Sequence, residues 1–76
     1  MPPGPGSRHP GQVIRAWRRR AGLTQEGLAV ALGVTFSTVS RWENGHVVPS
    51  KLAWRALEQL AAERNCPLVP ESGAGE

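Results

Sequence analysis

Residues 22–45, GLTQEGLAVALGVTFSTVSRWENG, hold two short helical patterns that are separated only by a tight turn at Gly33 and Val34. In each pattern the apolar residues recur three and four positions apart, so they share one face of a helix. Two helices joined by a three- or four-residue turn that contains Gly must cross steeply. The stretch therefore predicts a helix-turn-helix, in which the second helix presents its outer face and N-terminal end beyond the body of the domain.

Residues at the ends of these two patterns mark where each helix begins and stops. Thr24 is expected to cap a helix over 25–32, which Gly33 ends. Thr35 is expected to cap a helix over 36–44, which Gly45 ends. The inward positions of the pair are Leu28, Ala29, Leu32, Val39 and Trp42.

Two further amphipathic patterns flank this pair. The first covers 12–21, and the second covers 51–63, with Ser50 as its N-cap. The sequence predicts an all-α fold, a small bundle of four short helices with a fifth left open. The apolar stripes of the flanking helices are Val13, Ile14, Trp17 and Ala21, then Ala53, Trp54, Leu57, Leu60 and Ala61.

A chain of 76 residues is one small domain at most. Residues 1–10 carry four prolines and no apolar period, so we expect a flexible N-terminal arm. Pro67 lies in a stretch without pattern, so we expect 66–76 to be a disordered C-terminal tail. The ordered domain is therefore expected over 11–65.

The composition argues against several classes of protein. One cysteine, Cys66, excludes an internal disulfide, and two distant histidines provide no metal site. No membrane span, signal peptide, catalytic constellation or phosphate-binding loop is apparent, so we expect a cytoplasmic protein that is not an enzyme and needs no cofactor. A net charge of +3 favours a polyanionic partner without naming one.

The outer face of the 36–44 helix carries small polar residues and one arginine. Ser37 and Ser40 keep the helix slim enough for a DNA major groove, and Arg41 can place two hydrogen bonds on a guanine. The same residues also suit an ordinary solvated face. The complete helix-turn-helix pattern favours the interpretation that this helix reads DNA.

The chain resembles the phage-repressor and Cro type of helix-turn-helix protein, the lambda-repressor-like family often labelled by the xenobiotic response element. The resemblance spans about residues 13–61 and rests on IRAWRRRAGLTQEGLA, on LGVTFSTVSRWENG, and on the Pro49-Ser50 start of the last helix. It implies a sequence-specific, repressor-like regulator of transcription that binds double-stranded DNA and places helix 36–44 in the major groove.

The resemblance also implies roles for individual residues. Gln25, Thr35, Thr38 and Asn44 match positions that contact the DNA backbone. Phe36, Ser37 and Arg41 match positions that reach base edges. Arg18 and Glu43 match a partly buried ion pair that ties the first helix to the third.

Three questions stay open at this stage. Phe36 replaces a residue that is usually polar, and it can touch a thymine methyl or fold back towards Val39. Whether the chain forms a homodimer is not evident. The alternative function is a protein-binding module, such as an antitoxin or accessory subunit, that uses the outward Leu52 or a tail to bind a protein partner.

Overall fold

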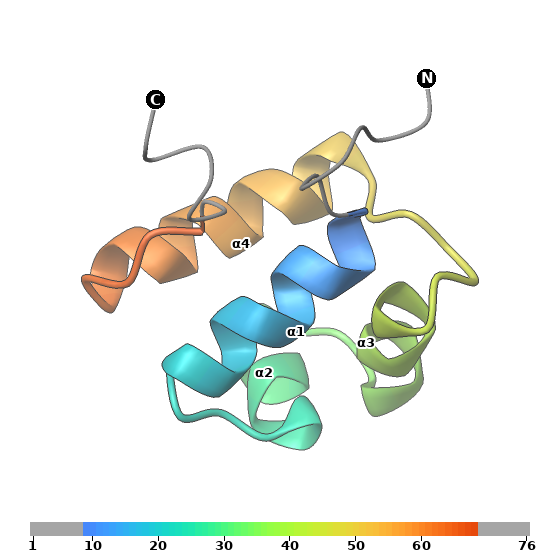
Figure 1. The fold of residues 1–76 in the computed structure, drawn as a ribbon, viewed down its shortest axis with the longest axis horizontal. Helices are drawn as coiled ribbons and strands as arrows, with labels where there is room; N and C mark the ends of the chain where they lie inside the picture. The colour runs from blue at the N-terminus through green and yellow to red at the C-terminus, as the bar shows by residue number, and fades with distance from the viewer. Residues whose placement is uncertain (1–8, 69–76) are drawn as a thin grey trace.

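The computed structural model describes residues 9–68. These residues form four helices, α1 (Pro10–Arg20), α2 (Gln25–Leu32), α3 (Phe36–Glu43) and α4 (Lys51–Glu63), and contain no strand. In Figure 1, α1 crosses the middle of the view, with α4 above it and α2 and α3 below. The expected all-α bundle is confirmed, and no fifth helix occurs within 9–68. No helix in that range is long and apolar enough to cross a membrane.

One core receives side chains from all four helices. Trp17, on α1, is fully buried at its centre, as the sequence predicted. Trp54, on α4, is partly buried and packs against the same cluster. The fully or nearly fully buried apolar residues of the helices are Ile14, Trp17, Leu28, Ala29, Val39, Trp42, Leu57 and Ala61.

The helix-turn-helix is formed by α2, the turn and α3, and both helices begin at the predicted caps. The Thr24 hydroxyl accepts a hydrogen bond from the Gly27 amide at 2.9 Å, and the Thr35 hydroxyl accepts one from the Thr38 amide at 3.1 Å. Gly33 has φ +75°, the left-handed conformation that favours glycine. The Val34 amide then bonds the Ala29 carbonyl at 2.9 Å, which closes α2 and turns the chain into α3.

Three helix ends differ from the sequence prediction, and one of them is the end of α1, which stops at Arg20 with Ala21 as its C-cap. Helix α1 begins at Pro10 instead of residue 12, because proline at the first helical position needs no hydrogen-bond partner and has a helical φ. Pro10 is therefore part of α1 and His9 is its N-cap, whereas residues 1–8 of the expected arm lie outside the described residues. Helix α3 ends at Glu43, and Asn44 serves as its C-cap, one residue before the expected end.

Gly11 determines how closely α1 can approach α3. A Cβ atom at this position would lie 2.2 Å from the carbonyl oxygen of Trp42 and 3.1 Å from that of Glu43. Any side chain at residue 11 would thus collide with the backbone at the end of α3. The glycine allows the two helices to pack directly against each other.

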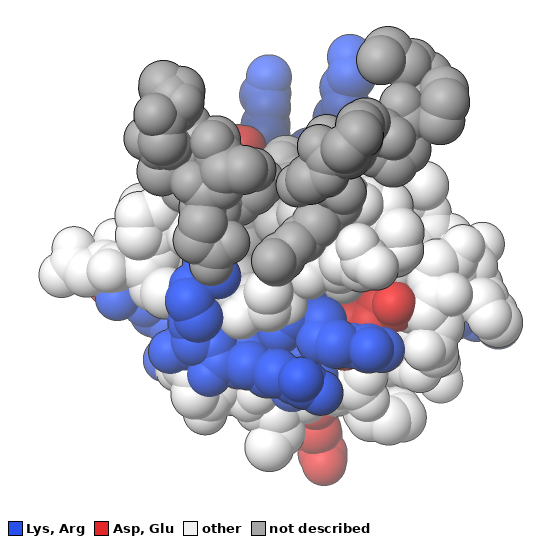
Figure 2. Space-filling model, viewed as in Figure 1, with Lys and Arg blue, Asp and Glu red and all other residues white. Residues whose placement is uncertain are grey.

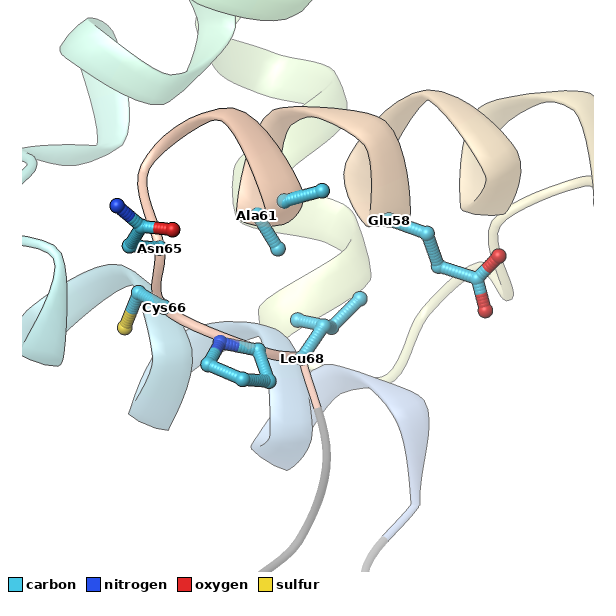
Figure 3. A pocket seen from close by; sticks show the side chains of 7 residues that line it. Glu58, Ala61, Asn65, Cys66 and Leu68 are labelled. Carbon is cyan, nitrogen blue, oxygen red and sulfur yellow. The ribbon is translucent and has the colours of Figure 1, made fainter.

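The packed domain extends three residues beyond the expected boundary at 65. Figure 3 shows the chain turning back after α4, so that Cys66 and Leu68 lie beside Ala61. Leu68 is 9% exposed and belongs to the core, and the indole N–H of Trp17 donates to the Cys66 carbonyl. Residues 66–68, expected to belong to the tail, thus make tertiary contacts with the domain although they have no helical pattern. Residues 69–76 lie outside the described range.

Candidate nucleic-acid interface

The outward face of α3 carries the residues that the sequence predicted to read bases. Phe36, Ser37 and Arg41 are all exposed. Together with Ser40, Asn44 and His46 they line one shallow hollow along the helix. The fold thus brings the predicted base-reading residues onto a single surface.

The first turn of α3 is held by its threonines. Thr35 is exposed, and its hydroxyl lies 2.9 Å from the hydroxyl of Thr38, which is half-buried. At the other end of the helix, the Asn44 amide donates to the Ser40 hydroxyl at 3.3 Å. The predicted backbone-contacting residues Thr35 and Asn44 therefore lie at opposite ends of one exposed helix, with their side chains oriented by local hydrogen bonds.

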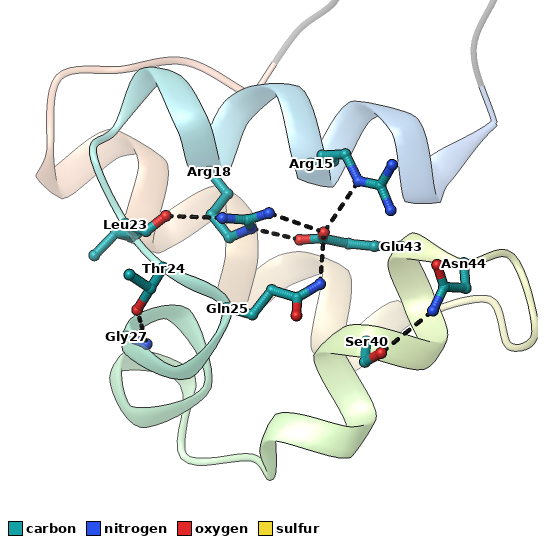
Figure 4. Close-up of polar contacts among 9 residues, drawn as sticks. All are labelled: Arg15, Arg18, Leu23, Thr24, Gln25, Gly27, Ser40, Glu43 and Asn44. Carbon is teal, nitrogen blue, oxygen red and sulfur yellow. Dashed lines mark hydrogen bonds and ion pairs between the residues drawn. The ribbon is translucent and has the colours of Figure 1, made fainter.

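The inner side of the same helix is anchored by Glu43, whose side chain is completely buried. Its carboxylate accepts two hydrogen bonds from the Arg18 guanidinium, Nε to Oε2 at 2.7 Å and Nη2 to Oε1 at 3.1 Å. Arg18 Nη1 donates to the Leu23 carbonyl at 3.0 Å, just before α2 (Figure 4). This geometry agrees with the ion pair that the resemblance implied, and it is more extensive than a pair.

Gln25 and Arg15 complete the network. The Gln25 amide donates to Glu43 Oε1 at 3.0 Å, and Arg15 Nε donates to the same oxygen at 3.3 Å (Figure 4). No buried side-chain polar atom within 9–68 lacks a hydrogen-bond partner. One carboxylate therefore connects α1, the start of α2 and the end of α3.

The protonation of Glu43 follows from these contacts. Burial alone would raise the pKa of its carboxyl group. The hydrogen bonds from Arg18, Gln25 and Arg15, together with the charge of Arg18, outweigh burial and hold that pKa below its usual value. Glu43 is thus a carboxylate at neutral pH, matched to a cation whose side chain is only 12% exposed.

Sequence reasoning missed two parts of this arrangement. Arg15 was given no role from the sequence, yet its side chain, 42% exposed, bends towards Glu43. The signal was present, because Arg15 and Arg18 are three residues apart and therefore neighbours on the helix surface. Gln25 was predicted only as a phosphate contact, and its bond to Glu43 depends on a residue 18 positions away.

Basic side chains gather on one face of the domain. Figure 2 shows Lys and Arg side chains across the lower middle of the view, where Figure 1 places α1 and its turn into α2. Helix α1 contributes Arg15, Arg18, Arg19 and Arg20, and Arg20 also donates to the Pro67 carbonyl at 3.0 Å. The helix-turn-helix therefore has a positive flank.

An exposed polar α3 that crosses α2 after a glycine turn, anchored to α1 by a buried ion pair, defines a helix-turn-helix domain. The chain belongs to the helix-turn-helix family, whose sequence pattern matches residues 14–61, and it is of the phage-repressor, xenobiotic-response-element type that the sequence resembles. The chain is 48% identical over 40 residues to a Bacillus subtilis (strain 168) protein named uncharacterized HTH-type transcriptional regulator YazB. That match covers 53% of this chain and 58% of the relative. No solved structure matches this chain significantly.

Proposed function

We propose that this protein is a sequence-specific regulator of transcription that binds double-stranded DNA and places α3 in the major groove. The observation that carries the proposal is the exposed hollow formed by Phe36, Ser37, Ser40, Arg41, Asn44 and His46. A helix whose outer face is slim and polar fits a groove about 12 Å wide. The family match and the name of the Bacillus relative support a role in transcription.

The proposal assigns two kinds of contact to two sets of residues. Arg41, exposed in the last turn of α3, donates a bidentate pair of hydrogen bonds to guanine O6 and N7, while Ser37 and Phe36 meet neighbouring base edges. Gln25, Thr35, Thr38 and Asn44 contact phosphates and set the register of the helix in the groove. A phosphate contact by Gln25 is compatible with its bond to Glu43, because an amide nitrogen has two hydrogens to donate.

Selection of bound fragments from a randomised duplex pool, with the purified chain at near-physiological salt, tests this proposal. An enriched motif supports it, and an inverted repeat would indicate a dimer whose recognition helices lie about 34 Å apart. Enrichment of no sequence, with weak and salt-sensitive binding to all DNA, would refute specific recognition.

Two variants then separate the assigned roles. Arg41→Ala is expected to weaken binding to the selected site by about 1–3 kcal/mol and to relax preference at one base pair. Gln25→Ala is expected to weaken binding to selected and random duplexes more evenly. Arg55→Ala, which removes an exposed arginine from α4, controls for loss of charge and should leave the base preference unchanged. Equal losses for Arg41→Ala on specific and random DNA would contradict its role in reading a base.

The alternative function, a protein-binding module such as an antitoxin or accessory subunit, has one supporting observation. Leu52 is 79% exposed and borders an apolar hollow with Leu32, Val34, Ala53 and Ala56. Single exposed apolar side chains are common on soluble proteins, so this observation is weaker than the surface of α3. Failure of the DNA selection would favour this alternative.

A further inference from the structure

Phe36 is the one Phe, Trp or Tyr residue that lines the hollow on α3, and it does not belong to the hydrophobic core. Its side chain is 52% exposed at the first position of α3. Val39 belongs to the buried core cluster, whereas Phe36 is neither in that cluster nor among the partly buried apolar residues packed against it. The possibility that Phe36 folds back into the core is therefore not supported.

The neighbours of Phe36 point to the ligand that it would meet. It lines the same hollow as Ser37, Ser40 and Arg41, all of which are polar. Contact between an apolar ring and water is unfavourable. The ring therefore contributes most to binding when an apolar group of the ligand covers it and removes its surface from water. The major groove displays one such group among the four bases of unmodified DNA, the C5-methyl of thymine.

We propose that Phe36 recognises a C5-methyl group in the major groove, so that binding depends on the methyl of one thymine in each half-site, meaning the DNA that one copy of the chain contacts. This inference rests on the proposed function and adds the identity of one recognised group. Cytosine methylated at C5 presents its methyl at the corresponding place on the pyrimidine ring, so the same contact makes binding sensitive to cytosine methylation at that position.

The spacing along α3 separates this contact from the one assigned to Arg41. Five residues correspond to about 7.5 Å along a helix. Base pairs are stacked about 3.4 Å apart. The methyl read by Phe36 and the guanine read by Arg41 therefore lie on different base pairs, and each can be changed without altering the other.

The first arm of the test changes only the DNA. Each dT of the selected duplex is replaced in turn by dU, which removes the C5-methyl and leaves every hydrogen-bonding group in place. One dU position per half-site is expected to weaken binding about fourfold, the effect of exposing one methyl-sized group. Replacing that T·A pair by C·G should weaken binding, and methylating the new cytosine at C5 should recover about fourfold.

The second arm assigns the effect to Phe36. In Phe36→Ala the Kd ratio between the dU and dT duplexes should fall to about one, whereas Phe36→Leu should keep part of the fourfold ratio. Val30→Ala, which removes an exposed apolar side chain of α2 that does not line the hollow, is the control and should keep the full ratio. Because Phe36 is exposed, its variants are expected to melt at the wild-type temperature, which circular dichroism checks.

The outcomes distinguish the inference from the proposed function. A selected motif in which no dU substitution changes the Kd by more than about twofold would overturn methyl recognition and leave sequence-specific binding intact. A dU effect that persists in Phe36→Ala would also overturn it, because another residue would then contact the methyl. Failure to select any motif would overturn both.

Discussion

Replacing Glu43 by alanine removes the only carboxylate in the network that joins α1, α2 and α3 within the described residues. Arg18 then loses the acceptors of its Nε and Nη2 groups and keeps one bond, from Nη1 to the Leu23 carbonyl. Its side chain is only 12% exposed, so water reaches the stranded cation poorly. The variant should therefore be destabilised mainly by an unpaired, largely buried charge.

The size of the effect follows from the burial of each partner. Removing one member of a buried ion pair costs about 3–5 kcal/mol. The lost bond from Arg15 adds little, because that side chain is 42% exposed and well hydrated. A domain of this size has a total stability of roughly 3–9 kcal/mol. Since about 1 kcal/mol changes the Tm of such a domain by at least 4 °C, Glu43→Ala should lower Tm by about 12 °C or more.

Thermal and urea unfolding at pH 7, followed by circular dichroism, measure this loss. Glu63→Ala, which removes an exposed glutamate at the end of α4, is the matched control and should change stability by less than about 0.5 kcal/mol. The double variant Arg18→Met with Glu43→Leu should recover most of the loss, because an apolar pair leaves no charge unpaired. A Tm of Glu43→Ala within about 3 °C of wild type would show that water compensates Arg18 and that the network is not effectively buried.

Three further variations test other parts of the fold. Because folding lowers the pKa of Glu43, the unfolded chain binds the proton more readily, and stability should fall as the pH drops below the ordinary glutamate value of about 4.3 and through the folded pKa. Measuring Tm against pH in acid should show this fall, and Glu43→Gln should reduce it. Gly11→Ala should lower the free energy of unfolding by about 1–3 kcal/mol, because its Cβ meets the Trp42 carbonyl. In Gly27→Ala the Cβ meets only side-chain atoms, so the loss should be much smaller or α2 should be stabilised, and equal Tm values for the two variants would contradict this. In urea unfolding, Leu68→Ala should lose about 2 kcal/mol of stability, whereas replacing Leu52, which is 79% exposed, by alanine should lose less than about 0.5 kcal/mol. Equal losses would argue against a packed 66–68 segment.

The parts of the fold that the sequence predicted well depend on neighbours in the chain. Thr24, Thr35 and Ser50 cap their helices through hydrogen bonds to an amide three residues later. Gly33 closes α2 through its left-handed backbone, and the apolar stripes follow from helical geometry. Such features involve spans of three to five residues, so a pattern within the sequence is enough to reveal them.

The parts that were missed depend on contacts between distant residues. Gly11 was placed at the start of the ordered domain without a role, and only the position of the Trp42 carbonyl explains why a glycine occurs there. Residues 66–68 have no helical period, yet Leu68 reaches the core because the chain turns back at Asn65, whose φ is +54°. Arg15 was given no role from the sequence, because its bond to Glu43 depends on a residue 28 positions away and on the length and flexibility of an arginine side chain.

The Glu43 network also bears on the candidate interface, although its carboxylate is buried. Through Arg18 it holds α3 against α1, and through Gln25 it orients a side chain proposed to meet a phosphate. In the proposed function, the helix that reads bases and the residue that sets its register therefore have a common anchor. Preorganisation of this kind reduces the conformational entropy that the protein loses when it binds DNA. It also implies that damage to the buried pair should weaken discrimination between sequences, since Gln25 and α3 would no longer be held in fixed relative positions.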